Sequence, residues 1–395
     1  MRRIAVVGAS LAGVSAARAL RKQGYDGELV IVGDEAEQPY DRPPLSKTLL
    51  AGEADEADIR LLRDGETLDA DWRLGVSATG LRPADRSVSL SDGTDLTVDA
   101  VVLATGARPR QPWPDPPAGV HTLRTLADAR ALRDRLRPGA QLVVVGAGFI
   151  GAEVASTARG LGVDVTVVEA LPTPLAAVLG EEFGAVLAGL HAAHGVRLLC
   201  GVGVSRLVGS VQMEGVELAD GRLIPADVVL VGVGVQPNVE WLAGSSLDAP
   251  GGVRCDAYGQ TGISTVVAVG DCASWYSPEL GGYYRLEHWT AARERAPIAV
   301  SALLSGGRDL IADRPPYVWS DQYGRTLQLA GLPAGADSVK VEEGSVADLD
   351  FLAVYRRGER PVALLALGQA RAFLRRRKQL VAEAAGRAGQ PTASG

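Results

Sequence analysis

Two copies of a strand–turn–helix unit with closely spaced glycines constrain the fold of this chain most strongly. The second copy is the more regular: Gly146, Gly148 and Gly151 follow the apolar run 141–145, a helical pattern begins, and Glu169 ends the next apolar run. The spacing from the last glycine to the acid is close to the roughly 20 residues of a dinucleotide-binding βαβ unit. Such a unit predicts that a pyrophosphate faces the helix N-terminus and that the acid binds a ribose hydroxyl.

The first copy departs from this pattern at its middle position. Gly8 and Gly13 flank Ser10, which stands where a glycine is usual, and Asp34 follows the apolar run 28–32. Serine is small enough to let the backbone approach a phosphate, so we still expect a dinucleotide here. Two dinucleotides on one chain suggest that electrons pass between them, one being a nicotinamide and the other a flavin.

The residues after Glu169 indicate which nicotinamide is used. Ala170, Leu171 and Pro172 follow, and none of them could neutralise a 2′-phosphate. The carboxylate of Glu169 would repel that phosphate. The sequence therefore favours NAD over NADP.

Composition excludes several other classes of protein. A net charge of −7 argues against nucleic acid as the main partner, and no apolar run is long enough to span a membrane. Cys200, Cys255 and Cys272 lie far apart and form no C-x-x-C pair, which argues against a dithiol centre or a cysteine zinc site and fits a reducing cytoplasm. His191 and His194 are expected on a helix surface, not at a metal, and no metal site is predicted.

Six further segments carry a resemblance to a known family. They are PYDRPPLSK (39–47), VVLATGARPR (101–110), VVLVGVGVQPN (228–238), VVAVGDC (266–272), EHW (287–289) and WSDQY (319–323). In this order and spacing, from residue 1 to about 370, the chain resembles the FAD-dependent, NADH-using ferredoxin reductases of cytochrome P450 and Rieske-type oxygenase systems. The first and last segments are the most specific to that family.

The resemblance implies an α/β fold with two Rossmann-like domains, one inserted in the other, and a C-terminal α+β domain, as in pyridine nucleotide-disulfide reductase-like flavoproteins. Similar hairpin-and-strand segments at 86–103 and 213–230 support a duplication. The expected domains are residues 1–107 with 236–310 for FAD, 108–235 for NAD, and 311–395 for the C-terminal domain with a disordered tail.

The resemblance also implies the cofactor contacts, position by position. On the flavin side these are Gly8, Ser10, Ala12, Gly13, Asp34, Arg42, Lys47, Val76, Ala104, Thr105, Gly106, Arg124, Gly270, Asp271 and Trp289. On the nicotinamide side they are Gly146, Gly148, Ile150, Gly151, Glu169 and Gly234.

Lys47, Glu153 and Trp319 are the implied catalytic residues. Glu153 follows the second glycine turn on a mainly apolar helix face, where a carboxylate is costly unless it is paired. We expect an ion pair with Lys47 near the flavin and expect Trp319 near the electron path. The alternatives are a solvent-exposed Lys47 on a short helix at 43–51 and a Trp319 that only fills the core.

The predicted function is electron transfer from NADH through FAD to a [2Fe-2S] ferredoxin, one electron at a time. Residues 36–60 contain no cysteine, whereas the disulfide- and peroxide-reducing relatives carry theirs there, so electrons should leave to an external carrier. A rubredoxin or quinone reductase, or an NADH-sensing flavoprotein resembling apoptosis-inducing factor, stays open. The protein is expected to be a cytoplasmic monomer or homodimer without a nucleic-acid or membrane partner.

Overall fold

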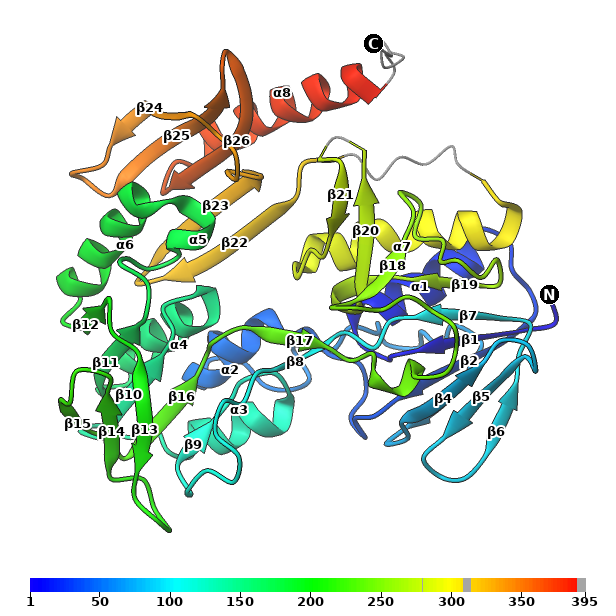
Figure 1. The fold of residues 1–395 in the computed structure, drawn as a ribbon, viewed down its shortest axis with the longest axis horizontal. Coiled ribbons are helices and arrows are strands. Elements are labelled where there is room, and N and C mark those ends of the chain that lie inside the picture. The colour runs from blue at the N-terminus through cyan, green and yellow to red at the C-terminus, as the bar shows by residue number, and fades with distance from the viewer. Residues whose placement is uncertain (279, 308–313, 389–395) are drawn as a thin grey trace.

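The computed structural model describes residues 1–278, 280–307 and 314–388; the predicted disordered tail lies outside these residues. Two parallel sheets and one antiparallel sheet organise the chain, and Figure 1 shows the first sheet at the blue end, the second in green and the third in orange. The predicted α/β class is confirmed, and the predicted C-terminal α+β domain is an antiparallel sheet with one helix.

The first sheet has the strand order β19-β7-β1-β2-β3, all parallel. Its strands are β1 (Arg3–Val7), β2 (Glu28–Gly33), β3 (Ala70–Leu74), β7 (Ala100–Leu103) and β19 (Val266–Ala268). Helix α1 (Leu11–Lys22) connects β1 to β2 and packs beside α7 (Trp289–Ser305).

Two small sheets accompany the first sheet. One is made of β4 (Ala78–Arg82), β5 (Ser87–Leu90) and β6 (Asp95–Thr97), and the other of β18 (Val253–Cys255), β20 (Ala273–Ser277) and β21 (Gly282–Tyr284). β2 and β7 lie on opposite sides of β1, so the connections that follow β1 and β7 run in opposite directions. In sheets of this kind, such a reversal opens a crevice at the carboxyl ends of the strands.

The second sheet repeats this arrangement with the order β12-β11-β10-β16-β9. Its strands are β9 (Val120–His121), β10 (Gln141–Val145), β11 (Asp164–Glu169), β12 (Arg197–Cys200) and β16 (Val228–Val231), and its helices are α3 (Leu126–Arg133), α4 (Phe149–Gly160), α5 (Ala176–Leu179) and α6 (Glu181–Ala193). An antiparallel meander of β13 (Val204–Val208), β14 (Gly215–Leu218) and β15 (Leu223–Pro225) matches the β4-β5-β6 meander of the first sheet.

Two short strands lie where the chain passes between these sheets. β8 (Ala107–Pro109) pairs antiparallel with β17 (Val235–Pro237), and Figure 1 shows them crossing the centre of the molecule. The expected domain boundaries at 107/108 and 235/236 fall on these strands and stay a prediction. The expected boundary at 310/311 lies outside the described residues. Helix α2 (Thr48–Ala51), which belongs to the first expected domain, packs into the same hydrophobic cluster as α3 and α4, so the two parts share a buried contact.

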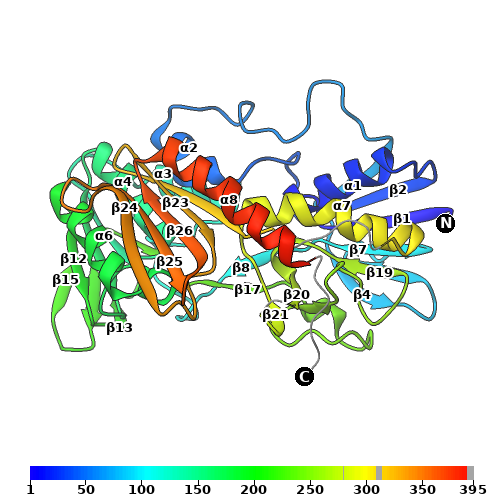
Figure 2. The ribbon, with the colours of Figure 1, turned by 90° about the horizontal axis from the view of Figure 1, so that it is seen from above.

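The third sheet is antiparallel, in the order β22-β23-β26-β25-β24. Its strands are β22 (Tyr317–Gln322), β23 (Arg325–Gly331), β24 (Ser338–Ser345), β25 (Asp350–Arg357) and β26 (Arg360–Leu367). Helix α8 (Ala370–Ala388) lies along one face, as Figure 2 shows, and α5 and α6 pack against the other. The edge strand β22 also contacts α4 and α7, so it reaches both nucleotide-binding parts.

The expectation that both histidines of α6 lie on the surface is wrong for His191. His194 is exposed, but His191 is buried, and its Nδ1 lies 2.6 Å from the hydroxyl of Tyr323. The cause is that α6 turns its apolar face toward the third sheet. Burial lowers the pKa of His191 to about 4, so the ring is neutral at pH 7.

Neither a metal cluster nor a membrane helix is found in the part of the chain that the structure describes. No group of three or more His, Cys, Asp or Glu side chains there is arranged to hold a metal ion. No helix there is both long enough and apolar enough to cross a bilayer.

Candidate functional site

The carboxyl ends of β1, β7 and β19 meet at a glycine-lined edge. Gly8 has a φ of +116°, and a Cβ at this position would lie 2.1 Å from the carbonyl oxygen of Ala104. A Cβ on Gly13 would lie 1.8 Å from the carbonyl oxygen of Gly8, and one on Gly270 would meet the Cβ of Ala12 at 2.8 Å. Because these positions have no side chain, the end of β1 can approach the end of β7, and the start of α1 can pack against the ends of β1 and β19.

Two arginines join the predicted flavin contacts along this edge. Arg42 donates from Nε to the Ser10 hydroxyl at 3.3 Å and from Nη1 to the carbonyl of Arg124. Arg124 in turn donates from Nη2 to Oδ2 of Asp271 at 2.8 Å. The Nε of Arg124 is buried without a hydrogen-bond partner among the described residues, so it can still donate to a bound polar group. These residues fit a bound dinucleotide.

Two carboxylates follow β2, and the structure gives them different surroundings. Asp34 is exposed, whereas Glu35 accepts a hydrogen bond of 2.6 Å from Nη2 of Arg42. The backbone N–H of Val76 donates to the carbonyl of Gly33, which places Val76 beside the same strand end. Sequence reasoning chose Asp34 and left out Glu35, because Gly33 occupies the usual acidic position and either residue after it could serve. The assignment of Asp34 to the ribose stays a prediction.

The second glycine turn is open at the N-terminus of α4. A Cβ on Gly146 would lie 2.4 Å from the carbonyl oxygen of Gly232, and one on Gly151 would lie 2.2 Å from that of Gly146. In contrast, a Cβ on Gly148, the N-cap of α4, would meet nothing within 4 Å. Ile150 in the first turn is 39% exposed. The turn is thus closed against the sheet and open toward the side where a pyrophosphate would bind.

Glu169, at the end of β11, is aimed at this turn. Its Oε2 accepts from the backbone N–H of Ala147 at 2.7 Å, and its Oε1 accepts from that of Leu171 at 2.9 Å. Gly234, after β16, has a φ of +94° and lies on the strand end next to β10. The predicted nicotinamide contacts therefore come together at one edge of the second sheet.

Lys47 and Glu153 form the expected ion pair, with Nζ 2.7 Å from Oε2. The Ser46 hydroxyl donates to the same oxygen at 2.5 Å, and the Ser320 hydroxyl donates to Oε1 at 2.7 Å. Only 17% of the Lys47 side chain and 7% of the Glu153 side chain are exposed, so Lys47 is not a solvent-exposed helix lysine. Sequence reasoning missed Ser46 and Ser320, because nothing in a short segment distinguishes a serine that binds a distant carboxylate.

Trp289 and Trp319 contact each other at the junction of α7 and β22. Their rings pack edge to face with centroids 5.7 Å apart, and Trp289 donates from Nε1 to Oδ1 of Asp41 at 2.7 Å. Burial raises the pKa of Asp41, although the indole hydrogen bond opposes this shift. The ring of Tyr317 stacks on Trp319, with centroids 6.0 Å apart. Trp319 is partly exposed, so it is not a fully buried core residue, and its place near the electron path stays a prediction.

Another residue missed by sequence reasoning fixes the segment after β7. Asn238 donates from Nδ2 to the carbonyl of Thr105 at 2.9 Å, and the Thr105 hydroxyl donates to the carbonyl of Asn238 at 2.7 Å. This reciprocal pair holds Thr105 and Gly106 at the flavin-side edge. Asn238 ends the VQPN segment, which contributed to the resemblance without being assigned a contact.

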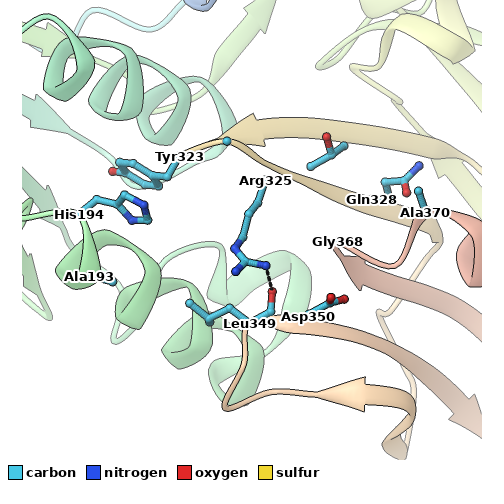
Figure 3. A pocket seen from close by; sticks show the side chains of 11 residues that line it. Ala193, His194, Tyr323, Arg325, Gln328, Leu349, Asp350, Gly368 and Ala370 are labelled. Carbon is cyan, nitrogen blue, oxygen red and sulfur yellow. Dashed lines mark hydrogen bonds between the residues drawn. The ribbon is translucent and has the colours of Figure 1, made fainter.

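A cleft of about 840 Å³ lies away from both glycine turns. Figure 3 shows His194, Tyr323, Arg325 and Asp350 around it, where α6 meets the third sheet. None of the predicted site residues lines it. The candidate site is therefore built from the two strand-end edges and not from this cleft.

Comparison with known proteins agrees with this geometry. Residues 2–296 match the pyridine nucleotide-disulphide oxidoreductase family, and residues 317–391 match the reductase C-terminal family. The chain belongs to the pyridine nucleotide-disulphide oxidoreductase family. This family of oxidoreductases uses FAD and NAD(H), as the sequence predicts.

Similar proteins within this family are ferredoxin reductases. The biphenyl dioxygenase system ferredoxin–NAD(+) reductase component of Paraburkholderia xenovorans is 41% identical over 348 residues, which cover 86% of this chain and 83% of that protein. Rhodocoxin reductase of Rhodococcus erythropolis is 37% identical, with coverage of 96% and 90%. The covalent putidaredoxin reductase–putidaredoxin complex superposes with a TM-score of 0.90 at 33% identity, covering 96% of this chain and 93% of that chain. The predicted relationship is confirmed.

Proposed function

We propose that this protein is an NADH-dependent ferredoxin reductase of a cytochrome P450 or Rieske-type oxygenase system. The observation that carries the proposal is the buried Lys47–Glu153 pair, which joins the part with the first glycine turn to the part with the second. Bound FAD would accept a hydride from NADH and release single electrons to a [2Fe-2S] ferredoxin. The names of the similar proteins support ferredoxin as the acceptor.

In this proposal, each strand-end edge holds one dinucleotide. Ser10, Arg42, Arg124 and Asp271 hold FAD, because they form one connected set beside the N-terminus of α1 and leave a buried N–H donor free for the ligand. The open N-terminus of α4 holds the NADH pyrophosphate. Lys47 and Glu153 supply a charged, largely buried contact between the two edges, which orients the reacting groups electrostatically.

The aromatic contact of Trp289 and Trp319 is proposed as the place where electrons leave. Trp319 comes from the C-terminal domain, is partly exposed, and touches a residue that the resemblance places beside the flavin. We also place the protein in the cytoplasm, because its three cysteines are free thiols.

The proposal is tested by cofactor release and anaerobic reduction. Supernatant from heat-denatured protein should contain one FAD per chain, and NADH should bleach the flavin of the intact protein without oxygen. Adding a [2Fe-2S] ferredoxin should then restore the flavin colour faster than rubredoxin or a quinone does. A reduced flavin that persists with every acceptor would favour the NADH-sensing alternative instead.

Nicotinamide selectivity provides a separate prediction. The wild-type protein should use NADH far better than NADPH, because the Glu169 carboxylate would repel a 2′-phosphate. The double variant Glu169→Gln and Ala170→Arg should raise the ratio of kcat/KM for NADPH to that for NADH by about 10-fold or more. The change removes the repulsion between the carboxylate and the 2′-phosphate and adds an arginine that can donate a charged hydrogen bond to this phosphate. Glutamine keeps an acceptor for the N–H of Ala147, so the turn stays closed.

The control for this prediction is Ala170→Arg alone. It adds the positive charge but leaves the carboxylate in place, so it should shift selectivity less than the double variant. Steady-state kinetics with both nucleotides measure the ratio. A wild-type protein that already used NADPH as well as NADH would contradict the role of Glu169.

A further inference from the structure

A chain of buried polar side chains runs from the C-terminal domain into the Lys47–Glu153 pair. Gln322 donates from Nε2 to the hydroxyl of Ser320 at 3.0 Å, and Ser320 donates to Oε1 of Glu153 at 2.7 Å. The other oxygen of Glu153 receives Lys47 and Ser46. One carboxylate on α4 is therefore held by two distant segments of the chain, at residues 46–47 and at Ser320.

The strand geometry explains why Ser320 and Gln322 act together. Side chains two residues apart in a strand point to the same side, so both residues face α4, whereas Trp319 and Asp321 point to the opposite side. Ser320 is 0% exposed, and Gln322 is 1% exposed. Buried polar groups at these positions are costly unless each one is hydrogen-bonded, and the chain to Glu153 satisfies that requirement.

The two oxygens of Glu153 have different tasks in this arrangement. Oε2 contacts Lys47 and Ser46, on the flavin side, while Oε1 has its hydrogen bond from Ser320 alone among the described residues. Without the Ser320 hydroxyl, Oε1 would lose its donor, and only the contacts of Oε2 would restrict rotation of the carboxylate about its last bond. The orientation of the ion pair would then be less fixed. The geometry of the ion pair thus depends on the C-terminal domain.

We propose that Ser320 and Gln322 are positioning residues for the reaction with NADH, acting through Glu153 on the orientation of Lys47. The inference rests on the proposed function, and it gives β22 two tasks. One side of the strand carries Trp319 toward the electron exit, and the other side sets the ion pair that serves hydride transfer. The C-terminal domain then controls the entry of electrons as well as their departure.

The test uses Ser320→Ala, Gln322→Leu and the double variant as FAD-loaded proteins. Anaerobic stopped-flow reduction over a range of NADH concentrations separates the limiting rate from the half-saturating concentration. Ser320→Ala should lower the limiting rate by about three- to tenfold, the size expected when one hydrogen bond to a charged group is lost. The half-saturating concentration should stay within about twofold. The absorption spectrum of the oxidised flavin should also shift, because the ammonium of Lys47 moves.

Gln322→Leu should give a smaller loss of rate. The double variant should be no slower than Ser320→Ala, because Gln322 acts only through the serine hydroxyl. Ser320→Thr keeps a hydroxyl at this position and should recover most of the limiting rate.

The matched control is Thr157→Val on the same helix as Glu153. The Thr157 hydroxyl donates to the carbonyl of Ser46 at 2.8 Å, so this nearly isosteric change removes a hydrogen bond across the same contact without touching Glu153. It should leave the limiting rate within about twofold of wild type and the flavin spectrum unchanged.

Three outcomes would overturn the inference. In the first, Ser320→Ala keeps a limiting rate within about twofold of wild type. In the second, Thr157→Val lowers the limiting rate as much as Ser320→Ala does. In the third, the double variant loses as much rate as the two single variants together, which would show that they act independently. A wild-type protein whose flavin NADH does not reduce at all would instead contradict the proposed function, so the two failures are distinguishable.

Discussion

Replacing Glu153 by alanine should lower the free energy of unfolding by about 3 kcal/mol, because Lys47 would lose the partner that compensates its burial. The same change should slow flavin reduction by NADH by more than about 10-fold, since the substitution removes the charge contact between the two dinucleotide sites. Denaturant titration measures the first effect, and anaerobic stopped-flow absorbance measures the second.

A paired substitution separates stability from chemistry. Lys47→Met combined with Glu153→Leu replaces the ion pair by apolar side chains, which often restores the stability lost when a single partner is removed. We therefore expect the double variant to recover part of the lost stability, but not all of it, because the buried Ser46 and Ser320 hydroxyls still lack their acceptor. It should still be reduced slowly. If Glu153→Ala kept the wild-type rate and NADH affinity, Glu153 would have no place in the mechanism.

Gly151→Ala should strongly impair reduction by NADH while leaving FAD bound. A Cβ at this position would lie 2.2 Å from the carbonyl oxygen of Gly146, so the second glycine turn and α4 would have to separate. We expect a loss in kcat/KM for NADH of about 100-fold or more, in line with the cost of misplacing a bound substrate by about 1 Å. FAD should stay bound, because none of its predicted contacts lies on α4 or in the turn before it.

Gly160→Ala is the matched control, because it makes the same chemical change at the other end of α4. A Cβ there would meet nothing within 4 Å, so no backbone movement is required. Alanine is the better helix former, and the free energy of unfolding should rise by about 0.5 kcal/mol or stay the same. Equal losses of activity in both variants would contradict a specific role for the turn at Gly151.

The parts of the fold that could be predicted are those with a repeating local pattern. The apolar runs, the glycine spacing and the acid after the second strand recur within short windows, so both dinucleotide-binding units follow from the sequence. Which residues of α6 are buried cannot be predicted in this way. His191 lies on the side of α6 that packs against the third sheet, and that sheet comes much later in the chain.

The site itself was predictable only in part. A buried carboxylate needs a partner, which is why Glu153 could be singled out and Lys47 proposed. Ser46 and Ser320 lie 107 and 167 residues from Glu153, and a serine in either segment reads as an ordinary turn or strand residue. Asp34 and Glu35 are adjacent acids, so only side-chain geometry shows which one contacts Arg42. Contacts between distant segments depend on packing, which no local pattern encodes.

The central claim is that electrons enter as a hydride from NADH and leave singly to ferredoxin. The most direct measurement is an anaerobic reaction of the FAD-loaded protein with limiting NADH and excess oxidised [2Fe-2S] ferredoxin, followed by absorbance. The account predicts about two reduced ferredoxins for each NADH consumed, with the flavin oxidised at the end, because a hydride carries two electrons and the cluster accepts one. Consumption of NADH with no reduced ferredoxin, leaving the flavin reduced, would contradict it.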